Sequence, residues 1–591
     1  MATLALAATA RPAWAQDQSA GPATTVDPRL LVEQLVAEGV ITREQADRMI
    51  ARATVPVQPH PAQGQAAQTA QAPIQGGVTA DGTQIVPYVP KVVREQIVAQ
   101  VREELGQQAQ AQGWARPGET PEWTRRIQLY GDVRMRGEGR FYDKSNADIF
   151  TDYGAINQGE PQNINDATPG WIAPAFVNSR EDRQRFRLRA RLGVHVRIAD
   201  WVSADIRVAT GNDSSPISTN QTLGAETGTG KYQLWLDRAS IRLTPVSGVN
   251  LDFGRFANPF WTSDLIFDND MNFDGVAVSA NGEVSGGLRL FGTAGAFPVF
   301  NTDLNFGSRN APVESASSGA YKSQDKYLLA AQAGLEVMPA DGVSARLSGA
   351  YFRYANVEGK RSAPCQFYEL VCSTDATRPA FQQFGNTMFP IRNIVADPLN
   401  PITSPENQYF GLASRFELLH VRGSVDYRAS DRFAVRLEGD YVRNLGWDRS
   451  VIATRAVNNL GPDTQVPNPN TPDPNDTMSA PGAYAGGNIG WQGRLSVGSV
   501  LNLNGQGDWT AKRGDWNAFV AYRHLESDAV IDAFADSDFH IGGTNVKGWQ
   551  IGGNYAFAPN TILGARWLSA EEIADAPFSL DRLFVDIMTR F

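Results

Sequence analysis

The stretch DRQRFRLRARLGVHVRI, residues 182–198, decides the fold class. Arginine occupies every second position from 183 to 191. The positions between and after these arginines carry Phe186, Leu188, Ala190, Leu192, Val194 and Val196. Successive side chains of a β-strand point to opposite faces, so the segment predicts a strand with one basic and one apolar face. Such a strand fits a soluble sandwich with its polar face in water, or a membrane barrel with its apolar face in lipid.

The connections between the alternating segments favour the membrane barrel. Period-two segments recur about sixteen times between residue 124 and the C-terminus, and their connections alternate between short and long. The short ones lie near residues 199–200, 245–248, 281–282, 339–342, 430–431, 505–514 and 559–560. The long ones cover roughly residues 142–182, 212–231, 256–274, 301–325, 355–408, 446–487, 525–545 and 569–578. Short periplasmic turns and long outer loops are typical of outer-membrane barrels. We therefore expect an all-β membrane barrel of about 16 antiparallel strands over residues 124–591, which is wide enough for an aqueous lumen.

The composition agrees with a barrel and disfavours other classes. Of the 591 residues, 42% are hydrophobic, and no run of about 18 apolar residues occurs, so no helical membrane span is expected. The mean hydropathy of −0.31 is compatible with a barrel, because a barrel strand shows lipid an apolar residue only at every second position. The net charge of −10 argues against nucleic acid as a partner.

The first residues are typical of the end of a secretory leader. The sequence MATLALAATARPAWAQ has an apolar patch followed by Ala13-Trp14-Ala15, which fits a cleavage site. The basic region that usually opens a leader is missing. We therefore expect residues 1–15 to be a signal-peptide remnant, with the true start of translation further upstream.

Residues 16–123 predict a helical periplasmic arm ahead of the barrel. A helical hairpin is expected over residues 16–53, where Pro28 opens the first helix and Gly39 ends it. Residues 54–90 are rich in Gln, Ala and Pro and predict a flexible linker. An amphipathic helix is expected over residues 91–123, with a stripe formed by Val93, Ile97, Val101 and Leu105. This helix packs either against its own barrel or in a short coiled coil with two further copies of a homotrimer.

Two further features fit an exported barrel. Cys365 and Cys372 are the two cysteines of the chain, and their close spacing predicts a loop disulfide formed in an oxidising compartment. The alternative is a pair of unrelated free thiols. The chain ends on Phe591, which follows Leu583, Val585, Ile587 and Thr589 on one face of the last strand. A terminal Phe that closes an alternating strand predicts a barrel-assembly signal.

Two long segments carry a resemblance to a known family. GRFANPFWTSDLIFDNDMNFDGVAV, residues 254–278, and DSDFHIGGTNVKGWQIGGNYAFAPNTILGARWLSAEE, residues 536–572, resemble signatures of the putative porin family of Gram-negative bacteria. The strand RFRLRARLGV, residues 185–194, is similar to one in that family and, more loosely, to one in phosphate-selective porins. The resemblance covers roughly residues 90–591. It implies a 16-stranded passive channel in the outer membrane, but it brings no residue-level site with it.

A pore acts through the charges of its lumen, and two groups of residues are candidates. A pore-lining basic wall is expected from Arg134, Arg136, Arg183, Arg185, Arg187, Arg189, Arg191 and Arg207. The connection over residues 256–274 carries an acidic group formed by Asp264, Asp268, Asp270 and Asp274. In 16-stranded porins the loop at this place folds inward and narrows the pore, so the resemblance implies a constriction loop here.

The two groups suggest a transverse electric field across the pore. An acidic loop facing a basic wall would orient dipolar solutes and exclude apolar ones. The alternative is that the aspartates bind Ca²⁺ or only hydrogen-bond the folded loop. Because both signs of charge line the expected pore, selectivity between anions and cations is left open.

No catalytic, cofactor or metal site is expected. The five histidines are scattered without metal-ligand spacing, and the acidic stretch 536–540 has no nucleophile elbow beside it. We therefore expect a non-enzymatic porin in the cell outer membrane, surrounded by lipid, that passes small polar solutes or ions. The alternative is a structural protein that tethers the membrane to peptidoglycan through residues 27–112.

Overall fold

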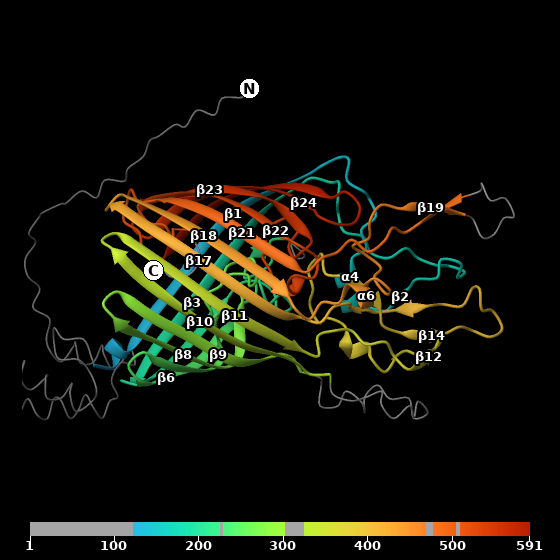
Figure 1. The fold of residues 1–591 in the computed structure, drawn as a ribbon, viewed down its shortest axis with the longest axis horizontal. Coiled ribbons are helices and arrows are strands. Elements are labelled where there is room, and N and C mark those ends of the chain that lie inside the picture. The colour runs from blue at the N-terminus through green and yellow to red at the C-terminus, as the bar shows by residue number, and fades with distance from the viewer. Residues whose placement is uncertain (1–121, 225–227, 302–323, 468–476, 504–508) are drawn as a thin grey trace, which may run out of the picture. The chain divides into compact units, whose positions relative to one another are not determined.

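The computed structural model describes residues 122–224, 228–301, 324–467, 477–503 and 509–591 (Figure 1). The expected signal-peptide remnant, hairpin and linker, and the amphipathic helix up to residue 121, lie outside these residues. The described part begins with a short 3-10 helix, η1 (Glu122–Arg126), which leads into the first strand. None of the helices in the described ranges is long and apolar enough to cross a membrane.

Sixteen long antiparallel strands among the described residues close into a barrel, as the sequence predicts (Figure 1). These strands are β1 (Ile127–Tyr142), β3 (Arg183–Ala199), β4 (Val202–Ala209), β6 (Trp235–Val246), β7 (Val249–Ala257), β8 (Asn272–Ser285), β9 (Leu288–Phe300), β10 (Lys326–Ala340), β11 (Val343–Ala355), β17 (Glu417–Ser430), β18 (Phe433–Asn444), β21 (Ile489–Gly498), β22 (Trp516–Leu525), β23 (Val546–Ala558), β24 (Thr561–Glu572) and β25 (Ser579–Arg590). Each strand pairs with the next along the chain. The last strand pairs with the first, with Val133 opposite Thr589, and this pairing closes the ring.

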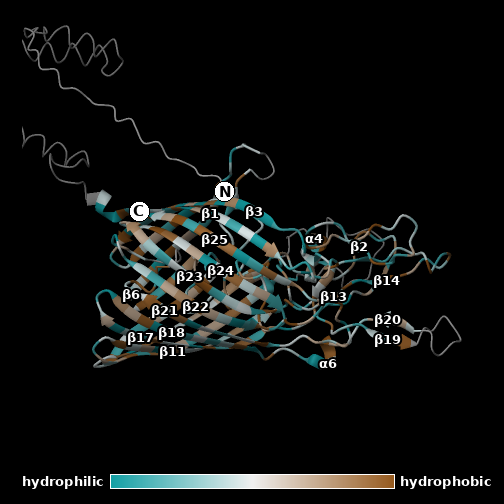
Figure 2. Cartoon of the chain, turned by 90° about the horizontal axis from the view of Figure 1, so that it is seen from above, coloured by the Kyte–Doolittle hydropathy of each residue, from teal (hydrophilic) through white to brown (hydrophobic). Residues whose placement is uncertain are grey.

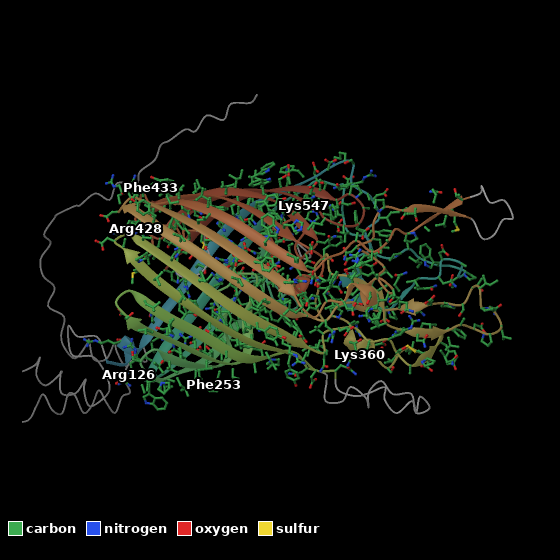
Figure 3. The ribbon with its side chains drawn as sticks, in the orientation of Figure 1. Arg126, Phe253, Lys360, Arg428, Phe433 and Lys547 are labelled. Carbon is green, nitrogen blue, oxygen red and sulfur yellow. A yellow bond between two sulfur atoms is a disulfide. The ribbon has the colours of Figure 1, made fainter. Side chains whose placement is uncertain are left out.

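Shorter elements lie in the long connections, most of them beyond one end of the barrel (Figure 1). The short strands are β2 (Gln162–Asn163), β5 (Gln221–Thr222), β12 (Pro364–Gln366), β13 (Met388–Pro390), β14 (Asn393–Val395), β15 (Asn407–Gln408), β16 (Phe410–Leu412), β19 (Thr464–Pro467) and β20 (Thr477–Ala480). The helices are α4 (Tyr153–Gln158), η2 (Asp375–Thr377), α6 (Arg449–Ile452) and η3 (Asp532–Phe534). The short turns lie at the other end, with Arg126, Arg428 and Phe433, whereas Lys360 and Lys547 lie toward the long loops (Figure 3). We call these ends the turn end and the loop end.

The alternation of the strands sorts side chains between the two faces of the barrel wall. Hydrophilic and hydrophobic residues alternate along the strands in Figure 2. On β1 and β3 the apolar positions face outward, where Phe186 is 68% exposed, and the charged positions face inward, where Arg136 is 2% exposed. An arginine facing lipid near the bilayer midplane costs about 2–4 kcal/mol, so this orientation is the stable one for a membrane barrel.

One expected turn is displaced in the structure. The Asn281-Gly282 pair, a typical turn dipeptide, lies within β8, and the chain turns instead at Gly286-Gly287. The hairpin ladder continues past the pair because Asn281 lies opposite Phe291 and Glu283 lies opposite Arg289. Gly287 has φ +82, a left-handed conformation that glycine adopts without strain. Cross-strand pairing therefore outweighed the local turn preference.

A large apolar core fills part of the lumen at the loop end. On β11, the inward Phe352 is fully buried, whereas its outward neighbour Tyr351 is 39% exposed. Leu418 on β17 and Val442 on β18 are also fully buried and belong to the same core. Loops that fold into the barrel contribute further core residues, among them Phe260, Leu265, Phe267, Met388, Phe389, Val530 and Phe539. The barrel therefore encloses packed protein as well as polar space.

Candidate functional site

The loop between β7 and β8, residues 258–271, crosses the lumen. Near its start, the backbone N–H of Trp261 donates to Oε1 of Gln332 on β10 at 2.8 Å, and Gln332 Nε2 donates back to the Trp261 carbonyl at 3.0 Å. Further along, Asp264 accepts a hydrogen bond from Nη2 of Arg523 on β22 at 2.7 Å. The strands β7 and β22 stand on opposite sides of the ring. The loop therefore reaches the far wall, which fits the expected constriction loop.

The same loop returns to the arginines of β3. Asp270 lies 3.2 Å from both Arg189 Nη1 and Arg191 Nη1. Asp132 of β1 also binds both arginines, at 2.9 Å to Arg189 and 2.7 Å to Arg191. The acidic loop thus contacts the basic wall directly, and each charge neutralises its neighbour. A transverse field across the pore requires an open gap between the acidic loop and the basic wall. At these residues the two are in direct contact instead.

The four aspartates of the expected acidic group have different surroundings. Asp268 accepts the backbone N–H groups of Asp270 at 2.9 Å and Ser537 at 3.0 Å, so it shapes the loop rather than facing an arginine. Asp274 does not belong to the constriction loop, contrary to the expectation from the sequence. It lies on strand β8 and pairs with Arg255 of β7 at 2.7 Å. The next residue pair on these two strands, Phe256 and Phe273, belongs to the lumen core, so Asp274 lies on the opposite, outer face.

A second loop, residues 526–545, also folds inward, which was not expected from the sequence. Its backbone joins the first loop, since Asp536 N–H donates to the Asp264 carbonyl at 3.1 Å. Asp538 binds Arg136 and Arg566, each at 2.8 Å. Asp536 binds Arg523 at 3.0 Å. In the sequence, the acidic pattern Asp536-Ser537-Asp538 lies between strands that carry arginines. This pattern is the feature that could have predicted that the loop folds into the lumen.

Glu138 of β1 is the centre of the basic wall at the loop end. Its carboxylate lies 2.7 Å from Arg582, 2.8 Å from Arg140 and 2.9 Å from Arg185. Arg187 is further away, at 3.7 Å. Four arginines therefore share one carboxylate.

The expected basic residues cluster, apart from two, in one charged layer of the lumen. Arg207 forms a separate buried pair with Asp237 of β6. Arg183 is exposed at the loop end of β3 and lines a cavity there. We define the arginine layer as Arg134, Arg136, Arg140, Arg185, Arg187, Arg189, Arg191, Arg566 and Arg582, with the carboxylates of Asp132, Glu138, Asp270, Asp538 and Asp586. Nine arginines face five carboxylates, so the layer carries excess positive charge.

Two cavities lie on either side of the arginine layer along the β1–β3 wall. The outer cavity, of about 570 Å³, lies at the loop end and is lined by Arg140, Arg183 and Arg185. The inner cavity, of about 480 Å³, lies at the turn end and is lined by Gln128 and Tyr130 of β1 with His195 of β3.

A third cavity lies on the other side of the crossing loop. This side cavity, of about 420 Å³, is lined by Trp261 of the loop and by Arg346, Arg422, Arg436 and Arg494 of the wall. Toward the loop end of the same strands, the inward positions are the buried Phe352, Leu418 and Val442. The apolar core therefore closes the side cavity at the loop end.

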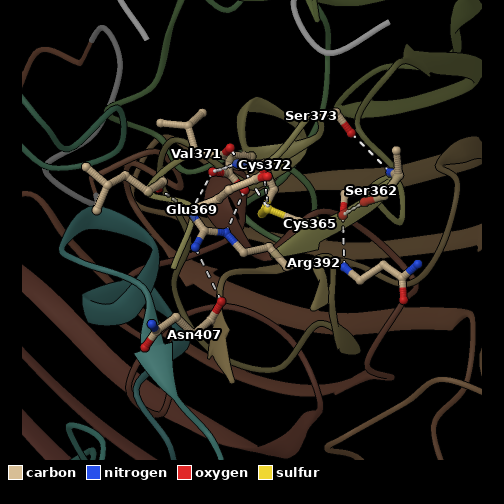
Figure 4. The surroundings of a disulfide bond; sticks show 12 residues. Ser362, Cys365, Glu369, Val371, Cys372, Ser373, Arg392 and Asn407 are labelled. Carbon is tan, nitrogen blue, oxygen red and sulfur yellow. Dashed lines mark hydrogen bonds and ion pairs between the residues drawn. A yellow bond between two sulfur atoms is a disulfide. The ribbon is translucent and has the colours of Figure 1, made fainter. Parts of the chain in front are cut away.

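The two cysteines form a disulfide in the long loop between β11 and β17 (Figure 4). Cys365 lies on β12, which pairs with β14. Beside the disulfide, Arg392 is buried and binds Asp375 at 2.6 Å. The disulfide therefore lies in a well-packed part of the outer loops.

Phe591 completes the seam between the first and last strands. Its backbone exchanges two hydrogen bonds with Gly131 of β1, at 3.0 and 3.1 Å. Its ring lies over Gly131, where an added Cβ would come within 2.8 Å of the ring. Phe591 is 62% exposed on the outer face of the closed barrel.

Several outer-membrane proteins of known structure are similar to this chain. Solved structures that resemble the chain include the outer membrane channel DcaP of Acinetobacter baumannii, at 12% identity and a TM-score of 0.35, covering 79% of this chain and 97% of that one. OprB of Pseudomonas putida matches at 11% identity and a TM-score of 0.35, covering 79% of this chain and 95% of that one. OmpF of Salmonella typhi, in complex with daunomycin, matches at 9% identity and a TM-score of 0.33, covering 79% of this chain and 97% of that one. No curated protein sequence matches the chain.

The family model described as a putative porin matches residues 24–591. The matched range includes residues 27–53, which lie outside the resemblance seen in the sequence, since that resemblance covered roughly residues 90–591. Because it covers nearly the whole chain, the protein belongs to the putative porin family.

Proposed function

We propose that solutes cross this porin along the β1–β3 side of its lumen. The protein is an outer-membrane channel for passive diffusion of small polar solutes or ions. The proposed route joins the outer cavity to the inner cavity through the arginine layer. The observation that carries it is the unequal filling of the barrel. The apolar core closes the side cavity at the loop end, whereas the β1–β3 wall carries a cavity with charged lining residues at each end.

Cysteine substitution of matched serines tests this route. Ser240 lines the inner cavity and Ser424 lines the side cavity, and both are half-buried. The native cysteines are disulfide-bonded, so a single introduced thiol is the reactive one. In planar bilayers, a charged thiol reagent should reduce the current through Ser240→Cys and leave Ser424→Cys unchanged. Equal inhibition of both variants would show that the side cavity conducts, which contradicts the proposed route.

The proposed assembly is a homotrimer. The Arg255–Asp274 pair on the outer face supports it, because charged side chains facing lipid are unfavourable, whereas a subunit interface accommodates them. The double variant Arg255→Ala/Asp274→Ala should shift the detergent-solubilised protein from trimer to monomer in native mass spectrometry. An unchanged trimer would place the interface elsewhere on the barrel.

We further propose that the N-terminal arm lies in the periplasm, since η1 leads into β1 at the turn end. A link to peptidoglycan through residues 27–112 is compatible with the pore. Sedimentation of the full chain with peptidoglycan sacculi, compared with a variant lacking residues 27–112, tests that link. Equal sedimentation of the two proteins would exclude it. No catalytic step is part of the proposed function.

A further inference from the structure

Arg134 differs from the other arginines of the layer in having no acidic partner. It lies on the inward face of β1 and is 5% exposed. Its Nη2 donates to Oδ1 of Asn220, a neutral amide, and its Nε has no hydrogen-bond partner. Among the residues that the structure describes, no carboxylate forms an ion pair with it. A buried guanidinium is thus held by an uncharged group alone.

Arg187 meets Arg134 at the same short segment, residues 218–220. Its Nη2 lies 3.3 Å from Oγ of Ser218 and 3.4 Å from the carbonyl oxygen of Asn220. Its Nε is also buried without a partner. Its one acidic contact is Glu138 at 3.7 Å, and that carboxylate already binds Arg140, Arg185 and Arg582 at shorter distances. Two guanidinium groups therefore converge where the nearest carboxylate, Glu138, is bound more closely by three other arginines.

The neighbouring carboxylates relieve this excess charge only in part, because each is bound more closely by another arginine. Asp586 binds Arg136 at 2.7 Å, and Asp270 is shared by Arg189 and Arg191. Burying a cation without a counter-charge is unfavourable, and a buried N–H without an acceptor adds to that cost. A mobile anion that reaches these residues would supply both the charge and the acceptors.

We propose that Arg134 and Arg187, with Ser218 and Asn220, bind a small oxyanion as it passes through the arginine layer. Two guanidinium groups present planar pairs of N–H donors that match the oxygen atoms of a carboxylate, sulfate or phosphate group. The Ser218 hydroxyl and the Asn220 amide supply further donors, and at present they bind each other at 3.2 Å. This inference rests on the proposed β1–β3 route and names the class of solute, which makes the channel selective for anions.

Sulfate is a suitable probe because its charge is constant near neutral pH. The full chain is tested in two ways, by isothermal titration of the detergent-solubilised barrel with sulfate, and by reversal potential and sulfate block in planar bilayers under a KCl gradient. The wild type should bind sulfate, prefer chloride over potassium, and lose chloride current as sulfate is added.

Three variants separate the site from general charge effects. Arg134→Gln should raise the sulfate Kd by about tenfold or more, since it removes charge-assisted hydrogen bonds. Arg134→Lys should have the reversal potential of the wild type but a lower affinity for sulfate. An ammonium group carries the same charge as a guanidinium group but lacks its planar pair of donors. Arg436→Gln is the matched control. It also removes one lumen arginine, but Arg436 is bound to Asp426 at 2.6 Å and lines the side cavity, so sulfate affinity should not change.

The outcomes distinguish this inference from the proposed route. Sulfate binding that is lost in Arg134→Gln and kept in Arg436→Gln supports the site, whatever the bilayer recordings show. An absence of current through the barrel would contradict the proposed route but not the site. A conducting channel whose sulfate affinity is the same in all four proteins overturns the site. A reversal potential that favours potassium in the wild type overturns anion selectivity.

Discussion

Arg187 and Arg189 stand two positions apart on the same face of β3, yet the structure predicts different consequences for their loss. Arg189 is 1% exposed, and it binds Asp132 at 2.9 Å and Asp270 at 3.2 Å. The second contact anchors the lumen-crossing loop to the wall. Arg187 makes only contacts of 3.3 Å or longer, to Ser218, Asn220 and Glu138. We therefore compare Arg189→Gln with Arg187→Gln, a matched pair with the same change in charge and size.

The contacts set the expected magnitudes. Arg189→Gln removes two charge-assisted hydrogen bonds, each worth about 1.5–3 kcal/mol, and leaves two buried carboxylates to share Arg191. Removing one partner of a buried ion pair costs about 3–5 kcal/mol, and we expect a loss of free energy of unfolding in this range. Arg187→Gln removes long contacts and relieves repulsion with Arg185 and Arg136. Its free energy of unfolding should change by less than about 1 kcal/mol.

Equilibrium unfolding in guanidinium chloride, followed by tryptophan fluorescence in detergent micelles, measures the difference. Heat-modifiable migration on gels provides an independent control for the folded barrel. Limited proteolysis should cut residues 258–271 faster in Arg189→Gln than in the wild type, because that loop loses an anchor. Equal losses of stability in the two variants, or a larger loss in Arg187→Gln, would refute the assignment of Arg189 as the anchoring arginine.

Three further outcomes are expected. Deletion of Phe591 should slow assembly in the outer membrane, because the seam loses its last pairing, and undiminished heat-modifiable barrel in cells would contradict this. Replacing Cys365 and Cys372 by Ser removes a short cross-link whose closure is worth about 2–3 kcal/mol of unfolded-chain entropy, so loop proteolysis should increase while conductance is unchanged; altered conductance would show that the disulfide shapes the pore. Burial raises the pKa of Asp532 to about 7, so the folded loop 526–545 binds more protons than the unfolded one between its ordinary pKa and 7. Stability of that loop should fall as pH rises through this window. Hydrogen-exchange protection of the loop amides, measured relative to their intrinsic exchange rate at each pH, should therefore be lower at pH 8 than at pH 5 in the wild type but not in Asp532→Asn; the same pH dependence of protection in both proteins would contradict the assignment.

The sequence by itself determined the barrel and the face on which its arginines lie. Both follow from short-range rules, since alternate residues of a strand share a face and five arginines in lipid would cost about as much as a typical domain's stability or more. Connection lengths are also readable along the chain, and they predicted the number of strands. The one displaced turn, at Asn281-Gly282, shows where this local reasoning fails, because the cross-strand partners Phe291 and Arg289 extended the hairpin.

The partners of the lumen charges could not be predicted from the sequence. Arg136 binds Asp538 and Asp586, which follow it by 402 and 450 residues, and no local pattern links them. The alternation of a strand says that an inward arginine needs a partner, but it does not say which loop folds in to provide one. Asp274 illustrates the same limit, since its place beside three loop aspartates suggested a shared function that its strand position removes.

Only the tertiary structure decided how the lumen is divided. Leu265 and Phe267 could be assigned from the sequence to a loop but not to a core, because burial depends on Phe352, Leu418 and Val442 arriving from distant strands. Closing the ring places these side chains against the inward loops on one side and leaves the β1–β3 side to the arginine layer. Local chemistry therefore fixed which residues face inward, and long-range packing fixed which of them meet water, which meet protein and which are left without a counter-charge.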